Sequence, residues 1–227
     1  MPFYVICDVS GSMSVEMAGL NSGLREIHQA IMTDPVVSDL VMMSVITFDS
    51  SARTVVPLAA PPDITLPSLS ATGSTNYSAA FQLFHQAFQA DRARLKGAGK
   101  QVYRPCIFFL TDGEPNDDGY KQTFRSLLAK ENNGSYPYVC AFGYGGASQA
   151  RMESLAYPDF GPESKRGRWF IANSGKSIGE LLKAIAPALA SSILSSGQSA
   201  SAGAPQMQFP QQVPGMTGGS ALGGSFV

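Results

Sequence analysis

The chain has 227 residues, 44% of them hydrophobic, which is enough apolar material for one well-packed core. Its 16 basic and 17 acidic residues give a formal net charge of −1, which argues against a nucleic-acid-binding surface. The sequence contains no run of about 18 apolar residues that could form a membrane-spanning helix, so we expect no membrane partner.

Three cysteines, Cys7, Cys106 and Cys140, each fall inside an apolar run. This placement is typical of buried free thiols and favours a reducing compartment. The chain also enters an apolar segment at Phe3 without the basic stretch or cleavage site of a secretory signal. We therefore expect a cytoplasmic protein.

Predicted strands and helices alternate along the chain. The strand candidates are Phe3–Asp8, Leu40–Phe48, Arg53–Leu58, Pro105–Thr111, Tyr136–Phe142 and Trp169–Ala172. Helical apolar spacing predicts one helix through Met17 and Ile31, a second over Tyr77–Leu95 and a third over Tyr120–Lys130. The alternation predicts an α/β fold: a doubly wound, mostly parallel six-stranded sheet with helices on both faces. Because only Asp49–Ala52 join the second and third strands, the third is expected to be an antiparallel edge strand.

The composition changes near the carboxyl end. No charged residue follows Lys183, and apolar spacing predicts a last helix that ends at about Ser195. Gly, Ser, Ala, Gln and Pro dominate residues 196–227, which is typical of disorder. The sequence thus predicts one domain over residues 1–195 and a disordered tail over 196–227, either a solubilising segment or a short linear motif for a partner.

Three polar loops fall at strand ends or helix starts. They are Asp8-Val9-Ser10-Gly11-Ser12, Ala71-Thr72-Gly73-Ser74-Thr75-Asn76 and Leu110-Thr111-Asp112-Gly113-Glu114. Ligands of doubly wound sheets bind beyond the carboxyl ends of the strands, where the strand order reverses. Together the loops offer two carboxylates and three hydroxyls, an all-oxygen set that suits Mg²⁺, with Mn²⁺ as a substitute. Because only two of these groups are acidic, a bound ion would keep an open position for a carboxylate of another protein.

The pattern Asp8-x-Ser10-x-Ser12, followed by Thr75 and then Asp112-Gly113, resembles the metal-ion-dependent adhesion site of von Willebrand factor A (VWA) domains. Phe48 and the stretch from Leu110 to Pro115 resemble the bacterial tellurite-resistance TerY branch of that family. The resemblance covers about residues 2–195. It implies a Rossmann-like open sheet of order 3-2-1-4-5-6 with one antiparallel edge strand.

The same resemblance implies a ligand set and a function. Both serines and the threonine would contact the metal directly, while the aspartates would often act through water. The protein would be a metal-dependent adaptor or scaffold in a bacterial tellurite or stress-response system. Its partner would be a protein that offers an Asp or Glu carboxylate and, for a TerY-like chain, a kinase or a phosphatase.

Other interpretations of these residues stay open. Asp8 and Asp112 could simply cap helices, or the fold could serve as an interaction surface while the site stays empty. A magnesium-dependent phosphatase that uses Asp8 as its nucleophile is the enzymatic alternative. However, Ser10 stands where such an enzyme needs a second aspartate as general acid, and a hydroxyl cannot do that work. We therefore expect a binding protein rather than an enzyme.

Two further segments follow the fourth and fifth predicted strands. Gly143-Tyr144-Gly145-Gly146 is interpreted as a tight turn at the rim of the metal site, since it lacks the glycine spacing of a dinucleotide-binding loop. The acidic stretch Glu114–Asp118 is interpreted as a solvated loop that caps the helix beginning at Tyr120.

Overall fold

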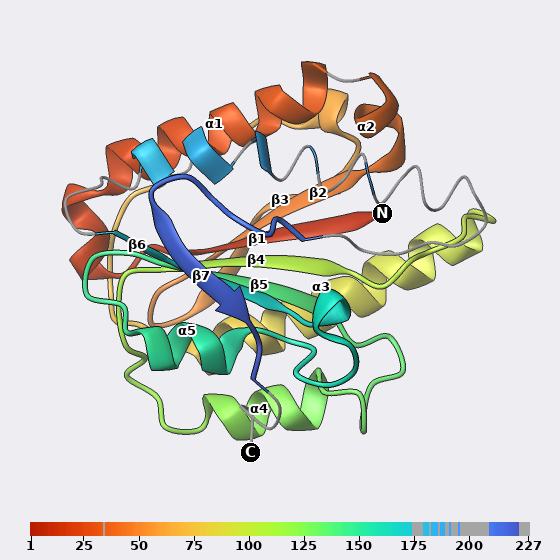
Figure 1. Cartoon of the computed structure of the whole chain (residues 1–227). Coiled ribbons are helices and arrows are strands. Elements are labelled where there is room, and N and C mark those ends of the chain that lie inside the picture. Colours follow the sequence, from red (N-terminus) through yellow and green to blue (C-terminus); the bar gives the residue numbers. More distant parts are fainter. Residues whose placement is uncertain are drawn as a thin grey trace.

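The computed structural model describes residues 1–33, 35–173 and 209–222, and between the last two ranges the positions 179–181, 183–185, 187, 188, 191 and 195. A seven-stranded sheet of order β3-β2-β1-β4-β5-β6-β7 lies at the centre of the molecule (Figure 1). Its strands are β1 (Pro2–Asp8), β2 (Met42–Phe48), β3 (Ala52–Ala59), β4 (Cys106–Thr111), β5 (Tyr138–Gly143), β6 (Arg168–Ala172) and β7 (Met216–Ser220). The five inner strands are parallel, and the edge strands β3 and β7 are antiparallel to their neighbours.

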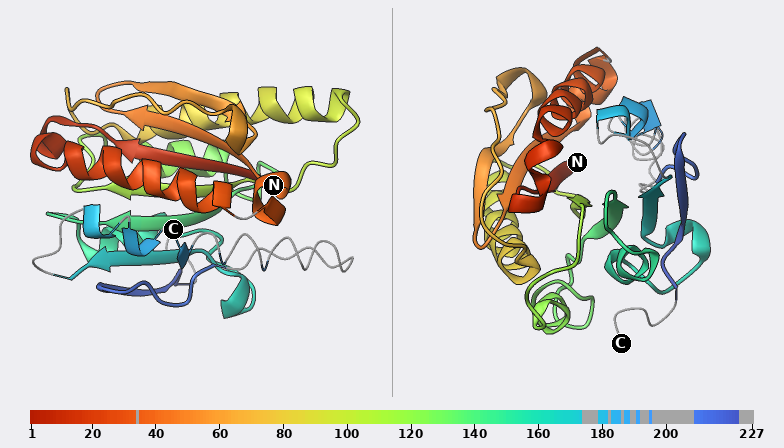
Figure 2. Two further views of the ribbon diagram at one scale, coloured as in Figure 1. Left: turned by 90° about the horizontal axis from the view of Figure 1, so that it is seen from above. Right: turned by 90° about the vertical axis from the view of Figure 1, so that its left-hand side faces the viewer.

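Helices cover both faces of the sheet (Figure 2). The first face carries α1 (Met17–Thr33), which is preceded by the 3₁₀ helix η1 (Gly11–Val15) and followed by the short α2 (Pro35–Leu40). The opposite face carries α3 (Tyr77–Gly97), α4 (Tyr120–Leu127) and α5 (Gln149–Leu155). Two further 3₁₀ helices, η2 (Pro61–Asp63) and η3 (Glu163–Lys165), lie in loops. The doubly wound fold and the antiparallel β3 confirm the prediction from the sequence.

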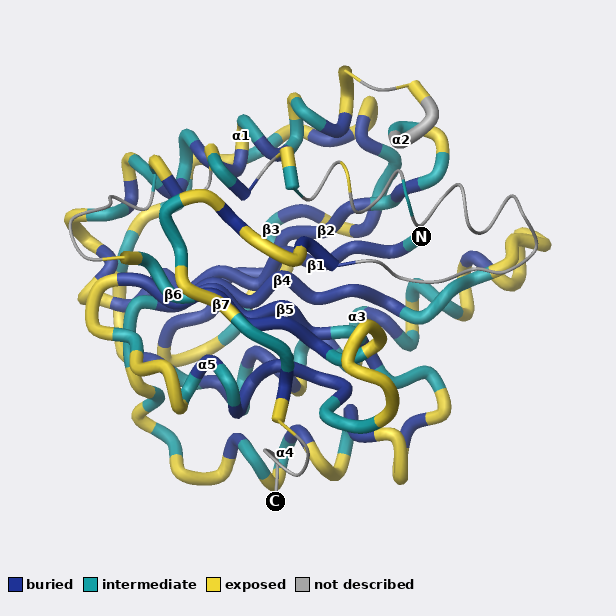
Figure 3. Tube along the Cα trace, in the orientation of Figure 1, coloured by how far each residue is buried: buried dark blue, intermediate teal, exposed yellow. Residues whose placement is uncertain are grey.

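The inner strands are buried on both faces, as their continuous apolar runs predict (Figure 3). Successive side chains of β1 enter opposite layers of the core: Val5 and Cys7 pack on the α1 side, whereas Tyr4 and Ile6 pack on the α3 side. All three cysteines are buried and free, as expected. Among the described helices, none combines the length and the hydropathy needed to cross a bilayer.

The last predicted helix falls partly outside the described residues. The positions that are described between 179 and 195 are helical, and Leu181 and Ile185 are buried against the α1 side of the sheet.

Residues 209–222 differ from the disordered tail that their composition predicts. They include β7, which pairs antiparallel with β6, and they bury Phe209, Val213 and Ala221. The glycines that suggest disorder have a packing role here. A Cβ at Gly218 would lie 2.3 Å from the Phe170 ring. Only a residue without a side chain lets this edge strand lie flat against the ring, so the sheet gains a seventh strand.

Candidate metal centre

The three polar loops meet at the carboxyl edge of the sheet, where the strand order reverses. β1 is the switch point, because β2 lies on one side of it and β4 on the other. The parallel register pairs Cys7 with Leu110, so the loops that follow these two strands leave the sheet side by side. The third loop is joined to the first by two backbone hydrogen bonds, from Gly11 N–H to Gly73 O (3.0 Å) and from Thr72 N–H to Val9 O (2.7 Å).

Four of the five candidate ligands form one chain of hydrogen bonds. The Ser10 N–H donates to Asp8 Oδ1 at 2.8 Å, and the Ser10 and Ser12 hydroxyl oxygens lie 3.1 Å apart. The Ser12 hydroxyl in turn donates to Asp112 Oδ1 at 3.0 Å. The sequence separates Ser12 from Asp112 by 100 positions, so this contact is made by the fold alone. The oxygen atoms therefore converge as a hard divalent cation requires.

The electrostatics of the two carboxyl groups favour a positive charge nearby. Burial raises the pKa of Asp8 above its usual range, against the opposing effect of hydrogen bonds from Ser10 and Thr111. Burial likewise raises the pKa of Asp112, and the charge of Glu16 adds to the rise. Two carboxylates that are costly to keep ionised are stabilised by a cation between them, so the residues fit a metal ion.

Thr75 is tied to the loop that follows Asp112 through a clamp of two hydrogen bonds. Its backbone N–H donates to Asn116 Oδ1 at 2.9 Å, and the Asn116 N–H donates back to the Thr75 carbonyl at 2.7 Å. Next to this pair, Asp117 accepts the backbone N–H groups of Tyr77 (2.9 Å) and Ser78 (3.1 Å). The Thr75 hydroxyl has no hydrogen-bond partner among the described residues, so its lone pairs are available to a ligand.

This clamp differs from the role that the sequence suggests for the acidic stretch. Asp117 binds the first turn of α3 and not that of α4, whose N-cap is Gly119 without a side-chain hydrogen bond. No local pattern could reveal this, because Asp117 and its partners lie about 40 positions apart in the chain. The α3 helix also has a local cap, since Asn76 Oδ1 accepts the Ala79 N–H at 2.9 Å.

Two hydroxyl groups in the core, those of Thr111 and Tyr77, hold the Asp8 carboxylate in place. Thr111 Oγ1 donates to Asp8 Oδ2 at 2.7 Å, and the Tyr77 hydroxyl lies 3.1 Å from Thr111 Oγ1 and 2.7 Å from the Gly113 carbonyl. Both carboxylate oxygens of Asp8 thus have donors, and the residue has no exposed surface. Asp8 is therefore held in one orientation behind the serines.

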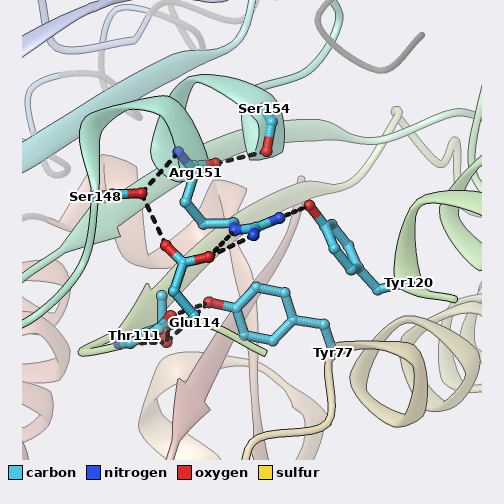
Figure 4. A network of polar contacts seen from close by, with 8 residues as sticks. Tyr77, Thr111, Glu114, Tyr120, Ser148, Arg151 and Ser154 are labelled. Atoms are coloured by element: carbon cyan, nitrogen blue, oxygen red, sulfur yellow. Dashed lines mark hydrogen bonds and ion pairs between the residues drawn. The ribbon is translucent and has the colours of Figure 1, made fainter. Parts of the chain in front are cut away.

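Glu114 is the third carboxylate near the site, and it is engaged elsewhere (Figure 4). It accepts a hydrogen bond from the Ser148 hydroxyl at 2.8 Å and forms an ion pair with Arg151, which also donates to the Tyr120 hydroxyl. Partial burial acts to raise the pKa of Glu114, but the hydrogen bonds from Arg151 and Ser148 outweigh it and lower the pKa. Glu114 thus joins the Asp112 loop to α5 rather than adding a third acidic ligand.

The turn after β5 lies against the same loop. The Gly146 N–H donates to the Asp112 carbonyl at 2.9 Å, and Gly145 has a φ of 58°, in the left-handed region that favours glycine. A Cβ at Gly146 would approach the Asp112 carbonyl oxygen to 3.3 Å. The segment is therefore a tight turn, as the sequence predicts, and it packs against the Asp112 loop. Across the described residues, no three His, Cys, Asp or Glu side chains come together, so hydroxyl oxygens must complete any cation site at this edge.

The chain is similar to known proteins in sequence family and in fold. A family model described as von Willebrand factor type A domain matches residues 3–114, a range that contains all five candidate ligands. No curated protein matches the chain. Solved structures with a similar fold include a von Willebrand factor type A protein from Catenulispora acidiphila, at 15% identity and a TM-score of 0.55 over 82% of this chain and 42% of that chain.

Two other solved structures are similar to the same extent. The ArnB paralog VWA2 from Sulfolobus acidocaldarius has 20% identity and a TM-score of 0.54, over 82% of this chain and 44% of that chain. The open form of the pilus adhesin SpaC from Lactobacillus rhamnosus GG has 15% identity and a TM-score of 0.60, over 84% of this chain and 30% of that chain. The chain thus spans less than half the length of each of these proteins. Residues 3–114 thus match the von Willebrand factor type A domain, and the chain shares the fold of these solved structures.

Proposed function

We propose that this domain is a binding module in which Asp8, Ser10, Ser12, Thr75 and Asp112 hold one Mg²⁺, or Mn²⁺ in its place. The observation that supports this best is the hydrogen-bonded chain from Asp8 through the two serines to Asp112, which gathers oxygen ligands from separate loops. A bound divalent cation would supply an open coordination position for a carboxylate oxygen of a protein partner. The serine hydroxyls and Thr75 add no charge, so the site would remain electrophilic.

The roles of the ligands follow from their surroundings. Ser12 is exposed and Asp112 is half-buried, so these two residues lie on the side from which a partner approaches. Asp8 is buried, with donors on both carboxylate oxygens, and would orient Ser10 and balance charge. The same enclosure argues against Asp8 as the nucleophile of a phosphatase, since a nucleophile needs free access to its substrate. We therefore propose no catalytic role.

The cellular setting is part of the proposal. The sequence resemblance to the TerY branch supports an adaptor in a bacterial tellurite or stress-response system, with a kinase or phosphatase as the partner. The three buried free thiols support a reducing, cytoplasmic setting.

Calorimetric titration of Mg²⁺ and Mn²⁺ into the whole chain tests the metal site. Ser12→Ala removes a hydroxyl from an exposed residue and is expected to weaken binding by at least tenfold without unfolding the protein. Asp8→Ala is expected to abolish binding. Asp63→Ala, at an exposed acidic residue of η2, is the matched control and should bind as the wild type does. Equal affinities in all four proteins would rule out the proposed site.

A further inference from the structure

One apolar side chain beside the candidate metal centre has no place in the core. Val15 has 87% of its surface exposed, more than any other large hydrophobic residue that the structure describes. It is the last residue of η1, and Ser12 precedes it by three positions. Because a 3₁₀ helix rises about 2 Å per residue, the two residues lie about 6 Å apart along the helix axis.

Single exposed valines are common on protein surfaces, but this one is presented by a rigid turn. Met13 is fully buried, and the Tyr144 hydroxyl lies 3.0 Å from its sulfur. The Ser14 hydroxyl donates to the Gly11 carbonyl at 2.6 Å, and the Glu16 N–H donates to the Met13 carbonyl at 2.9 Å. With Met13 anchored before it and α1 beginning after it, Val15 cannot turn inward.

The charges around the site limit what can dock there. Glu16 lies next to Val15 and its charge acts on Asp112, whereas the charge of Glu114 is balanced by its ion pair with Arg151. A partner that carries several carboxylates would be repelled by Glu16. A partner with one carboxylate and one apolar side chain avoids this penalty. Its carboxylate is paired with the cation, and its apolar side chain brings no further charge next to Val15.

We propose that Val15 is the apolar half of a two-point docking surface whose other half is the cation site. The partner is a protein segment with a single Asp or Glu and, within about two residues of it, a branched aliphatic or aromatic side chain, a spacing that spans the distance to Val15. This inference rests on the proposed function and adds the identity of the residue beside the carboxylate.

A peptide array tests the inference with the whole protein in Mg²⁺. Each peptide carries one central glutamate, the positions beside it vary through all residue types, and a parallel set carries glutamine instead. We expect the wild type to prefer Leu, Ile or Phe beside the glutamate. Val15→Ser should weaken binding to those peptides by roughly tenfold, the effect of one lost aliphatic contact, and leave Ser-flanked peptides unchanged.

Two controls separate this inference from the proposed function. Met32→Ser removes another exposed apolar residue, near the far end of α1 and about 22 Å along the helix from its start, and should behave as the wild type does. Calorimetry should give Val15→Ser the Mg²⁺ affinity of the wild type. Glutamate- and Mg²⁺-dependent binding without an apolar preference would overturn the role of Val15 alone. Binding that survives EDTA or the change to glutamine, or no binding to any peptide, would overturn the proposed function as well.

Discussion

At the scale of single residues, Asn116 is the contact that ties Thr75 to the loop that follows Asp112. Asn116→Ala removes the acceptor of the Thr75 N–H, so the threonine loop should lose its fixed position. We expect Mg²⁺ affinity to fall about tenfold, as happens when groups that orient metal ligands are lost. Isothermal titration measures this directly. Asn132→Ala is the matched control, since within the described part of the chain its side-chain amide donates to the Arg125 carbonyl alone. An equal fall in both variants would refute the clamp.

A second prediction at this scale compares Glu114 with Asp112, two nearby carboxylates that have different partners. Glu114 is bound to Arg151 and Ser148, whereas Asp112 accepts from Ser12. Glu114→Gln should therefore leave Mg²⁺ affinity within about twofold of the wild type and cost less than about 1 kcal/mol of stability, since the ion pair is exposed. Asp112→Asn should remove most of the affinity. A large loss in Glu114→Gln would make this residue a ligand.

The candidate ligands could be predicted from the sequence because each lies directly after a strand or before a helix. Asp8 ends β1 and Asp112 directly follows β4, so the fold class alone brings them to one edge of the sheet. The residues that position them could not be predicted in the same way. Thr111, Asn116 and Asp117 act on partners far away in the chain, and their own neighbours in the sequence carry no sign of those contacts.

At the scale of elements, the apolar strands and the long helices matched the structure, whereas two short helices and the last strand were not predicted. The predicted third strand and the helix from Tyr77 agree with β3 and α3 to within about two residues. The helices α2 and α5 were missed, because six or seven residues are too few for a helical period to stand out. β7 was missed for a different reason: its glycines carry no hydrophobic signal, and they are favoured by the aromatic rings of β6.

The close contact of Gly218 with β6 leads to a prediction about the packing of β7. In Gly218→Val, the new Cβ would meet the Phe170 ring at 2.3 Å and the Trp169 carbonyl oxygen at 2.6 Å, so β7 must shift away from β6. We expect a loss of about 1–3 kcal/mol in the free energy of unfolding, the usual range for overpacking. Trp169 is the only tryptophan of the chain, so its emission should shift to longer wavelength.

Gly134→Val is the matched control for this experiment, because no atom lies within 4 Å of a Cβ built there. Denaturant unfolding followed by fluorescence should leave this control within about 0.5 kcal/mol of the wild type, as is usual for surface substitutions. If Gly218→Val unfolded at the same denaturant concentration as the control, the close packing of β7 on β6 would be refuted.

At the scale of the whole molecule, the arrangement separates the candidate binding edge from the segment that completes the sheet. The five candidate ligands follow β1 and β4 or precede α3, in the middle of the sheet, whereas β7 closes its far edge (Figure 1). The candidate ligands and the edge pairing therefore belong to different strands. A change at the β7 edge should alter stability while leaving the polar loops intact.

Truncation tests this separation. A chain that ends at residue 208 loses β7 together with the buried Phe209, Val213 and Ala221. We expect its free energy of unfolding to be about 3 kcal/mol lower than that of the full chain, since burying one large apolar side chain contributes about 1.5–3 kcal/mol. Its Mg²⁺ affinity, measured on the fraction that is folded, should equal that of the full chain. A chain that ends at residue 222 keeps every described residue of the strand and serves as the control. If the shorter chain were as stable as this control, β7 would be a dispensable addition; if it lost Mg²⁺ affinity while folded, the edge strand and the metal centre would be coupled through the sheet.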